Sequence, residues 1–133
     1  MVSKEEILQQ WLDKGNEELE SAEYLSTMRY PTPDETICYL CQQSAEKYLK
    51  GFIFFHDAEP EKTHDLEYLL EICQKYDAKF STLSSSAVIL TRYAVLPRYP
   101  NELEITGEDM KNALKHAKII KEFVLSFLNQ DCK

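Results

Sequence analysis

Apolar residues recur every three or four positions through almost all of this chain, which is the spacing of one face of an α-helix. The stretch that begins at Leu8 continues in this way through Leu12 and Leu19. Only 3 Gly and 5 Pro occur in 133 residues, which disfavours a turn-rich β-sandwich or barrel. We therefore predict an all-α protein, an antiparallel up-and-down bundle of four long helices plus one short helix. The predicted helices cover residues 4–28, 34–57, 64–77, 80–96 and 107–128.

The residues that precede the expected helices are of the kinds that cap helices. Ser3 and Glu6 have the spacing of a capping box. Before the second helix, Thr32 is the expected N-cap, Pro33 the first helical residue and Glu35 the capping-box partner. These signals fix where the first two helices should begin.

Chain length and charge restrict the domain organisation and the partners. A chain of 133 residues fits one domain, so we treat residues 1–133 as a single helical domain. The net charge of −8 argues against sequence-independent binding to nucleic acid or to an anionic membrane. No apolar run is long enough to span a bilayer and no signal-peptide pattern opens the sequence, so we expect a soluble cytoplasmic protein.

The cysteines are interpreted as structural thiols; they are Cys38, Cys41, Cys73 and Cys132. Cys38 and Cys41 form a C-x-x-C motif, but it lies inside an expected helix, whereas a thioredoxin-like site places it between a strand and a helix. No second C-x-x-C or H-x₃-H motif supplies further zinc ligands, and no Walker A or G-x-G-x-x-G motif is present. We therefore predict no metal site and no cofactor.

The second helix carries the pattern Q-x-A-E-K-x-L-K, which begins at Gln43 and ends at Lys50. Further features stand along the chain in a fixed order: Trp11 in the first helix, His64 and Leu66 at the third, and Arg98-Tyr99-Pro100 after the fourth. Over roughly residues 5–128 this combination resembles the HEPN family, the "higher eukaryotes and prokaryotes nucleotide-binding" domain. The resemblance implies a bundle of four to five helices, pairing as a homodimer, and association with a minimal nucleotidyltransferase.

Many HEPN proteins are ribonucleases built on an Arg-x₄₋₆-His motif, in which histidine supplies acid–base chemistry and arginine stabilises the transition state. Arg29, Arg92 and Arg98 have no histidine at that spacing downstream. We therefore assign no catalytic residue and do not expect the chain to be an enzyme. We expect His56 to interact with the dipole at the end of the second helix, and His116 to be exposed.

Cationic and aromatic side chains suited to an anionic ligand or to a protein partner come from three of the expected helices. These candidates are Lys47, Lys50, His64, Arg92, Tyr93, Arg98 and Tyr99. Two interpretations stay open for them: nucleotide contacts, and a structural, solvated or interface role. We expect His64 beside the end of the second helix, and the end of the fourth helix at the same place. Glu46 and Lys50 should form an i, i+4 ion pair worth about 0.3–0.5 kcal/mol.

The leading hypothesis is a HEPN-like helical binding module that partners a minimal nucleotidyltransferase and binds a nucleotide. One alternative is a divergent HEPN ribonuclease, or a toxin of a toxin–antitoxin-like pair, without the Arg-x₄₋₆-His motif. Another is a homodimeric scaffold without a ligand. We expect a homodimer in each case, because 8 Tyr and 6 Phe are more aromatic surface than a small bundle core easily hides.

Overall fold

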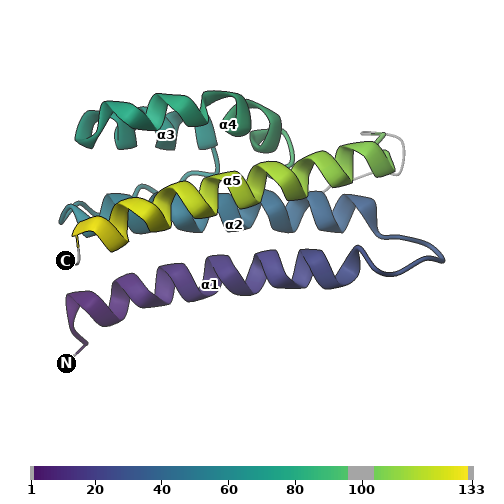
Figure 1. Ribbon diagram of the computed structural model, residues 1–133, viewed down its shortest axis with the longest axis horizontal. Coiled ribbons are helices and arrows are strands. Elements are labelled where there is room, and N and C mark those ends of the chain that lie inside the picture. The colour runs from purple at the N-terminus through teal and green to yellow at the C-terminus, as the bar shows by residue number, and fades with distance from the viewer. Residues whose placement is uncertain (1, 96–103, 132–133) are drawn as a thin grey trace.

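Helices account for most of the structure, a computed structural model that describes residues 2–95 and 104–131. Within those residues there are five α-helices, one 3-10 helix and no strand (Figure 1). The elements are α1 (Lys4–Leu25), α2 (Asp34–Phe55), α3 (Leu66–Tyr76), the 3-10 helix η1 (Ala78–Leu83), α4 (Ser84–Thr91) and α5 (Gly107–Asp131). The prediction of an all-α helical bundle is confirmed.

The helix expected over 80–96 differs from the prediction in both its start and its end. Its first part is the 3-10 helix η1, and the α-helical part, α4, ends at Thr91. Beyond that point the backbone N–H groups of Tyr93 and Ala94 bond to carbonyls three residues earlier, at Leu90 and Thr91. The chain therefore leaves the α-helical pattern in tight turns before the prolines that were expected to stop it.

The helix starts agree with the capping signals at α1 but not at α2. The Ser3 hydroxyl accepts a hydrogen bond from the backbone N–H of Glu6 at 3.2 Å, as predicted. At α2 the predicted cap is wrong, because Pro33 stands at the N-cap position and makes no side-chain cap bond. Thr32 instead donates its hydroxyl to the carbonyl of Met28. That bond ties the turn before α2 back to the end of α1.

α2 is the central helix, and the other long elements pack around it (Figure 1). α1 runs antiparallel to α2, so that Lys4 pairs at 2.8 Å with Asp57, just beyond the end of α2. The segment 56–65 then turns back along α2 and brings His64 beside the middle of that helix. As a result, α3 runs in the same direction as α2, and α4 returns toward the start of α2.

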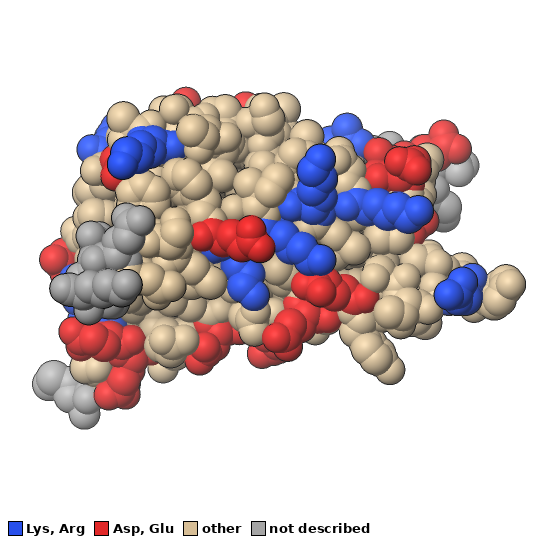
Figure 2. Space-filling view, viewed as in Figure 1, with Lys and Arg blue, Asp and Glu red and all other residues tan. Residues whose placement is uncertain are grey.

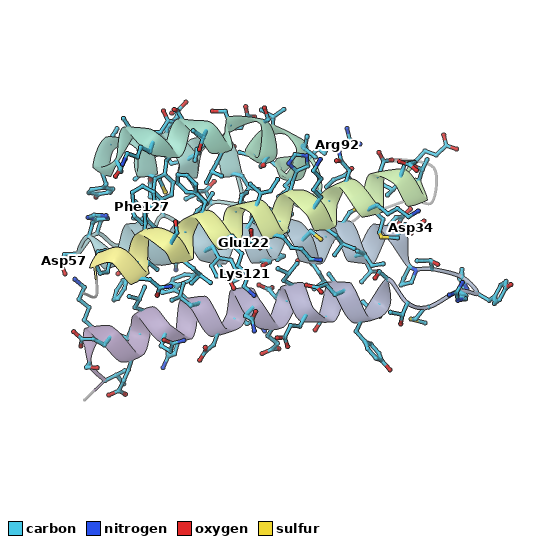
Figure 3. The ribbon with its side chains drawn as sticks, in the orientation of Figure 1. Asp34, Asp57, Arg92, Lys121, Glu122 and Phe127 are labelled. Carbon is cyan, nitrogen blue, oxygen red and sulfur yellow. The ribbon has the colours of Figure 1, made fainter. Side chains whose placement is uncertain are left out.

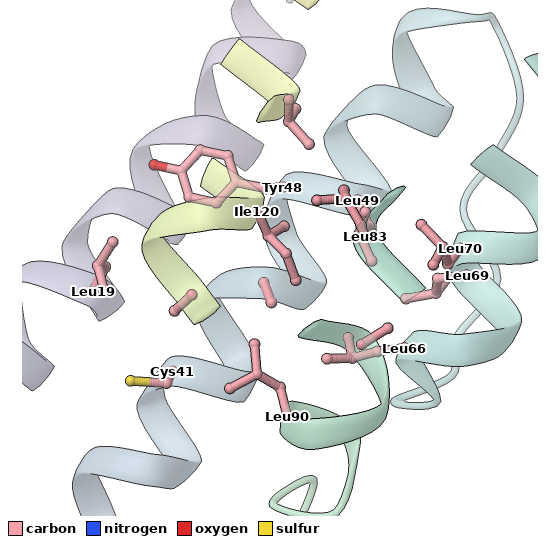
Figure 4. Close-up of a cluster of buried hydrophobic side chains, with 14 of the residues drawn as sticks. Leu19, Cys41, Tyr48, Leu49, Leu66, Leu69, Leu70, Leu83, Leu90 and Ile120 are labelled. Carbon is pink, nitrogen blue, oxygen red and sulfur yellow. The ribbon is translucent and has the colours of Figure 1, made fainter. Parts of the chain in front are cut away.

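The core lies between α2 and the helices that cover it (Figure 4). Tyr48, Phe52 and Phe80 are its largest fully buried side chains. The rings of Phe52 and Phe80 are 4.1 Å apart, and α5 adds Phe127 to this aromatic cluster. Burial of these aromatic rings contributes to holding η1 and α5 against α2.

The described cysteines lie in this core, which agrees with their interpretation as structural thiols. Cys38, Cys41 and Cys73 are all buried and free, and Cys132 lies outside the described residues. Burial raises the pKa of the Cys38 and Cys73 thiols to about 12, so both stay protonated at neutral pH. The thiols therefore pack as small apolar groups.

Figure 2 shows lysines gathered over α5 and acidic side chains along α1, with further acidic side chains on α5 itself. The exposed lysines of α5 are Lys111, Lys115 and Lys118. The ammonium of Lys118 lies 3.8 Å from the carboxylate of Glu23, which links α5 to α1. No helix in the part of the chain that the structure describes is both long and apolar enough to cross a membrane.

Candidate functional site

A row of polar side chains on α2 is largely buried by the bundle. Gln43, Glu46, Lys47 and Lys50 recur at helical spacing along two turns. Only 3% of Glu46 and 6% of Lys50 are exposed. Charged groups in such surroundings are unfavourable unless they are paired and hydrogen-bonded. The row therefore depends on partners, which come from α2 itself, from α1 and from the segment 56–65.

Glu46 is the centre of one group, the Glu46 cluster, which consists of Gln42, Glu46, Lys50 and His64. Oε1 of Glu46 lies 2.8 Å from Nδ1 of His64. Oε2 of the same carboxylate accepts a hydrogen bond from Nζ of Lys50 at 3.0 Å. Fully buried Gln42 donates to the backbone carbonyl of His64 at 2.8 Å. The expected Glu46–Lys50 pair is present and buried, while 61% of the His64 side chain is exposed.

A second group joins α2 to α1. The ammonium of Lys47 lies 3.3 Å from Glu18 and 3.4 Å from the amide oxygen of Gln43. Burial raises the pKa of Glu18, and the nearby Lys47 ammonium partly opposes that rise. Lys47 is thus held at the seam between the two helices rather than extended into solvent.

Lys47 also lines a surface hollow of about 290 Å³ between α1 and α2. The other residues that line this hollow are Ile7, Gln10, Trp11 and Lys14. Trp11 is the one tryptophan of the sequence. An indole and two ammonium groups around one hollow are suited to a planar, anionic ligand, because aromatic rings stack on bases and ammonium groups contact phosphates.

Of the residues that line this hollow, only Lys47 was predicted from the sequence as a candidate site residue. Trp11 entered only through the family resemblance, and Lys14 was not among the candidates. A signal was available, because Trp11, Lys14 and Glu18 fall at i, i+3 and i+7 on one face of α1. That Lys47 of α2 lines the same hollow follows only from the packing of the two helices.

Arg92 and Tyr93 lie at the end of α4, in a different environment (Figure 3). The Arg92 guanidinium is 3.4 Å from Asp109 at the start of α5 and 5.0 Å from the centre of the Tyr93 ring. Tyr93 is 2% exposed and lies against Cys38, near the start of α2. The expectation that the end of the fourth helix meets the end of the second is therefore wrong, because the segment 56–65 reverses the direction of α3.

The candidates predicted from the sequence fall into two places. Lys50 and His64 share the Glu46 cluster, with Lys47 on the same row, although His64 lies beside the middle of α2 rather than its end. The end of α4 does meet the start of α3, where the Leu66 backbone N–H bonds to the Thr91 hydroxyl at 3.0 Å. The remaining two candidates, Arg98 and Tyr99, lie outside the described residues.

The other two histidines have structural contacts. His56 follows the last residue of α2 and stacks on Tyr76 with ring centres 4.2 Å apart. The prediction of an exposed His116 is wrong, because that ring is partly buried and its Nδ1 lies 2.8 Å from the Ser86 hydroxyl. Burial, together with the charge of Lys115, lowers the pKa of His116. Among the described residues no group of three or more histidine, cysteine or acidic side chains is placed to hold a metal ion.

The helical arrangement and the α2 motif match one family. The model of the HEPN domain matches residues 8–127, and the chain belongs to this family. A crystal structure of an archaeal HEPN homologue is similar at a TM-score of 0.69 and 24% identity, covering 90% of this chain and 95% of that one. A protein from Thermus thermophilus is similar at a TM-score of 0.69 and 23% identity, covering 90% and 96%. No curated protein matches the chain.

Proposed function

We propose that this chain is a HEPN binding module that takes a nucleotide in the hollow between α1 and α2. The observation that carries the proposal is the placement of Trp11, Lys14 and Lys47 around one hollow. Trp11 offers a surface on which a base stacks, and the two ammonium groups contact phosphate oxygens. The absence of an Arg-x₄₋₆-His motif from the sequence argues against the ribonuclease alternative.

Charge and size restrict the ligand further. A chain of net charge −8 repels polyanions, so an anionic ligand requires a local group of cations. The ammonium of Lys47 is already paired with Glu18. The side chain of Lys14 is 53% exposed, and its ion pair is the 3.5 Å contact with exposed Glu17. A hollow of about 290 Å³ stands at the lower end of the range for small-molecule sites. It suits a base in the hollow and phosphates at its rim, near Lys14.

The proposal is tested by titrating ATP and GTP while recording tryptophan fluorescence. Trp11 is the one tryptophan, so a change in emission reports on the hollow itself. The substitution Lys14→Gln should weaken nucleotide binding about fivefold, or about 1 kcal/mol, because it removes one exposed charged contact to phosphate.

The matched control is Lys111→Gln, which removes the same charge from an exposed position on α5. It should leave the affinity almost unchanged, because the charge it removes does not line the hollow. If neither nucleotide changes the Trp11 emission, or if both substitutions weaken binding equally, the site is not in this hollow.

A protein partner is a second part of the proposed function. The end of the bundle that holds the turn between α1 and α2 presents Tyr24, Met28 and Tyr30, of which Tyr30 is 96% exposed. Exposed aromatic groups of this kind are enriched in protein interfaces, and we infer that a second copy of the chain packs here. The family resemblance adds a minimal nucleotidyltransferase as a further partner, in a pair of the toxin–antitoxin kind.

A further inference from the structure

His64 differs from an ordinary surface histidine in how its two ring nitrogens are placed. Its side chain is 61% exposed, yet Nδ1 lies 2.8 Å from the carboxylate of Glu46, which is only 4% exposed. Glu46 also accepts from the ammonium of Lys50, so the tautomer that satisfies both contacts has Nδ1 of His64 as the donor. In that tautomer the ring lone pair is on Nε2, for which the described residues supply no hydrogen-bond partner.

The groups around this pair hold it in place. Lys50 donates to the second oxygen of Glu46 at 3.0 Å, which fixes the carboxylate and offsets its charge. Gln42 donates to the backbone carbonyl of His64 at 2.8 Å, which anchors the residue itself. A carboxylate that fixes the tautomer of an imidazole and directs its free nitrogen outward is the arrangement found in histidines that act as nucleophiles or bases.

The other two histidines lie in different surroundings, and both are less exposed than His64. Nδ1 of His116 lies against the Ser86 hydroxyl, and the ring is partly buried. His56 is stacked face to face on Tyr76. His56 and His116 therefore serve as less exposed internal controls for His64.

We propose that Nε2 of His64 is a phosphoryl-acceptor site for donors of the phosphoramidate class, which includes phosphohistidine on another protein. In the step, the Nε2 lone pair forms the new N–P bond while the P–N bond of the donor breaks. The bonding electrons leave with the donor nitrogen. Phosphoramidate carries its proton on that nitrogen and departs as ammonia, whereas phosphohistidine carries it on the other ring nitrogen and departs as a neutral imidazole, so no proton has to be supplied. The product is a phosphorylated imidazolium, whose Nδ1–H continues to donate to Glu46. This proposal does not depend on nucleotide binding in the hollow.

The experiment uses the full chain and phosphoramidate as the probe. Intact-mass and peptide mass spectrometry at neutral to basic pH follow the gain of one phosphoryl group, and loss of that group on acidification identifies phosphohistidine. We expect modification at His64 to be at least about tenfold faster than in a peptide of residues 60–68, since the peptide exposes the same ring without the orienting carboxylate. Modification at His56 and His116 should be slower still.

Glu46→Gln tests the cause of the reactivity, because it keeps the shape of the side chain and removes the charge that fixes the tautomer. The rate at His64 should fall to about that of the peptide, roughly tenfold or more. A rate at His64 in the native chain no higher than in the peptide would overturn the proposal, and this comparison does not depend on whether the variant folds. Equal rates in the native chain and in a folded Glu46→Gln variant would overturn it as well.

Discussion

The contribution of the i, i+4 pair of Glu46 and Lys50 to stability depends on its burial in the folded bundle. On an isolated helix such a pair contributes about 0.3–0.5 kcal/mol and is screened by salt. Here both side chains are at most 8% exposed, and His64 completes the arrangement. In buried pairs, removing one partner leaves a charge without compensation, which is far more destabilising than losing a surface pair. The same two residues thus act as a structural junction between α2 and the segment 56–65.

Gly15 provides a prediction at the residue scale. A Cβ at this position would lie 2.9 Å from the ring of Tyr48, which is 1% exposed and cannot move aside easily. Overpacking of this kind costs about 1–3 kcal/mol, which exceeds the gain of at most about 1 kcal/mol from replacing glycine in a helix. Gly15→Ala should therefore lower the free energy of unfolding by about 1–2 kcal/mol, measured by urea denaturation.

Gly107→Ala is the control, because a Cβ at the first residue of α5 meets no atom within 4 Å. It should leave stability unchanged or raise it by up to about 1 kcal/mol. Equal destabilisation by the two substitutions would show that the approach of Tyr48 to α1 is not what requires glycine at position 15.

At the scale of elements, α4 is joined to its neighbours by specific polar contacts as well as by apolar packing. The Ser86 hydroxyl lies 2.8 Å from Nδ1 of His116 on α5, and the hydroxyl of Thr91 accepts from the Leu66 backbone N–H at the start of α3. Both contacts join residues that lie 25 or more positions apart in the chain. A short helix with a weak apolar face is placed in this way by hydrogen bonds at its two sides.

The contact between α4 and α5 should make stability depend on pH. Burial lowers the pKa of His116 below the ordinary value of 6.5, so the unfolded chain takes up a proton at a higher pH than the folded chain does. The free energy of unfolding should then fall as the pH drops through 6.5 toward the lower pKa of the folded state. Above 6.5 the contribution is fully present.

Urea denaturation of the native chain and of His116→Gln, at about pH 7.5 and about pH 5.5, measures this contribution. The glutamine can still bond to Ser86 but does not titrate, so its stability should fall less on acidification. Carboxylates elsewhere contribute equally to both proteins and cancel in the comparison. An identical loss of stability in the two proteins would show that His116 does not titrate differently on folding.

At the scale of the whole molecule, several aromatic side chains are exposed to solvent in the single chain. Tyr24 is 75% exposed and Tyr30 is 96% exposed, and both lie at the end of the bundle where α1 turns into α2. A surface of this kind is more typical of an interface than of a monomer. Light scattering should therefore give about twice the chain mass of 15.5 kDa.

Replacing Tyr24 and Tyr30 together by serine should weaken this dimer by more than about 1 kcal/mol, because tyrosines are frequent hot spots of interfaces. Val88→Ser is the control, since Val88 is 54% exposed on α4 and lies outside this surface. A native chain of 15.5 kDa in solution would contradict the dimer itself. A dimer that both sets of substitutions weaken equally would place the interface elsewhere.

The features that could be predicted from the sequence alone are those that depend on residues close together in the chain. Periodicity over a few turns indicated the helices, the Ser3 cap marked the start of α1, and the α2 pattern indicated the family, because each is a property of adjacent residues. The sequence also indicated Lys47, Lys50 and His64 as candidates and predicted the i, i+4 pair of Lys50 with Glu46. The partners of His64 and Lys47 depend on tertiary packing, because Glu46 lies 18 residues from His64 and Glu18 lies 29 residues from Lys47.

His64 lies away from its expected position because of the path of one connection, the segment 56–65 between α2 and α3. An antiparallel bundle with direct turns would bring the start of the third helix to the end of the second, and that was the expectation for His64. The segment 56–65 instead runs back along α2, which moves His64 to Glu46 and carries the end of α4 to the start of α2. No local pattern records that path, because the hydrogen bonds that hold it join His64 to Gln42 and Glu46, which lie 22 and 18 positions away in the chain.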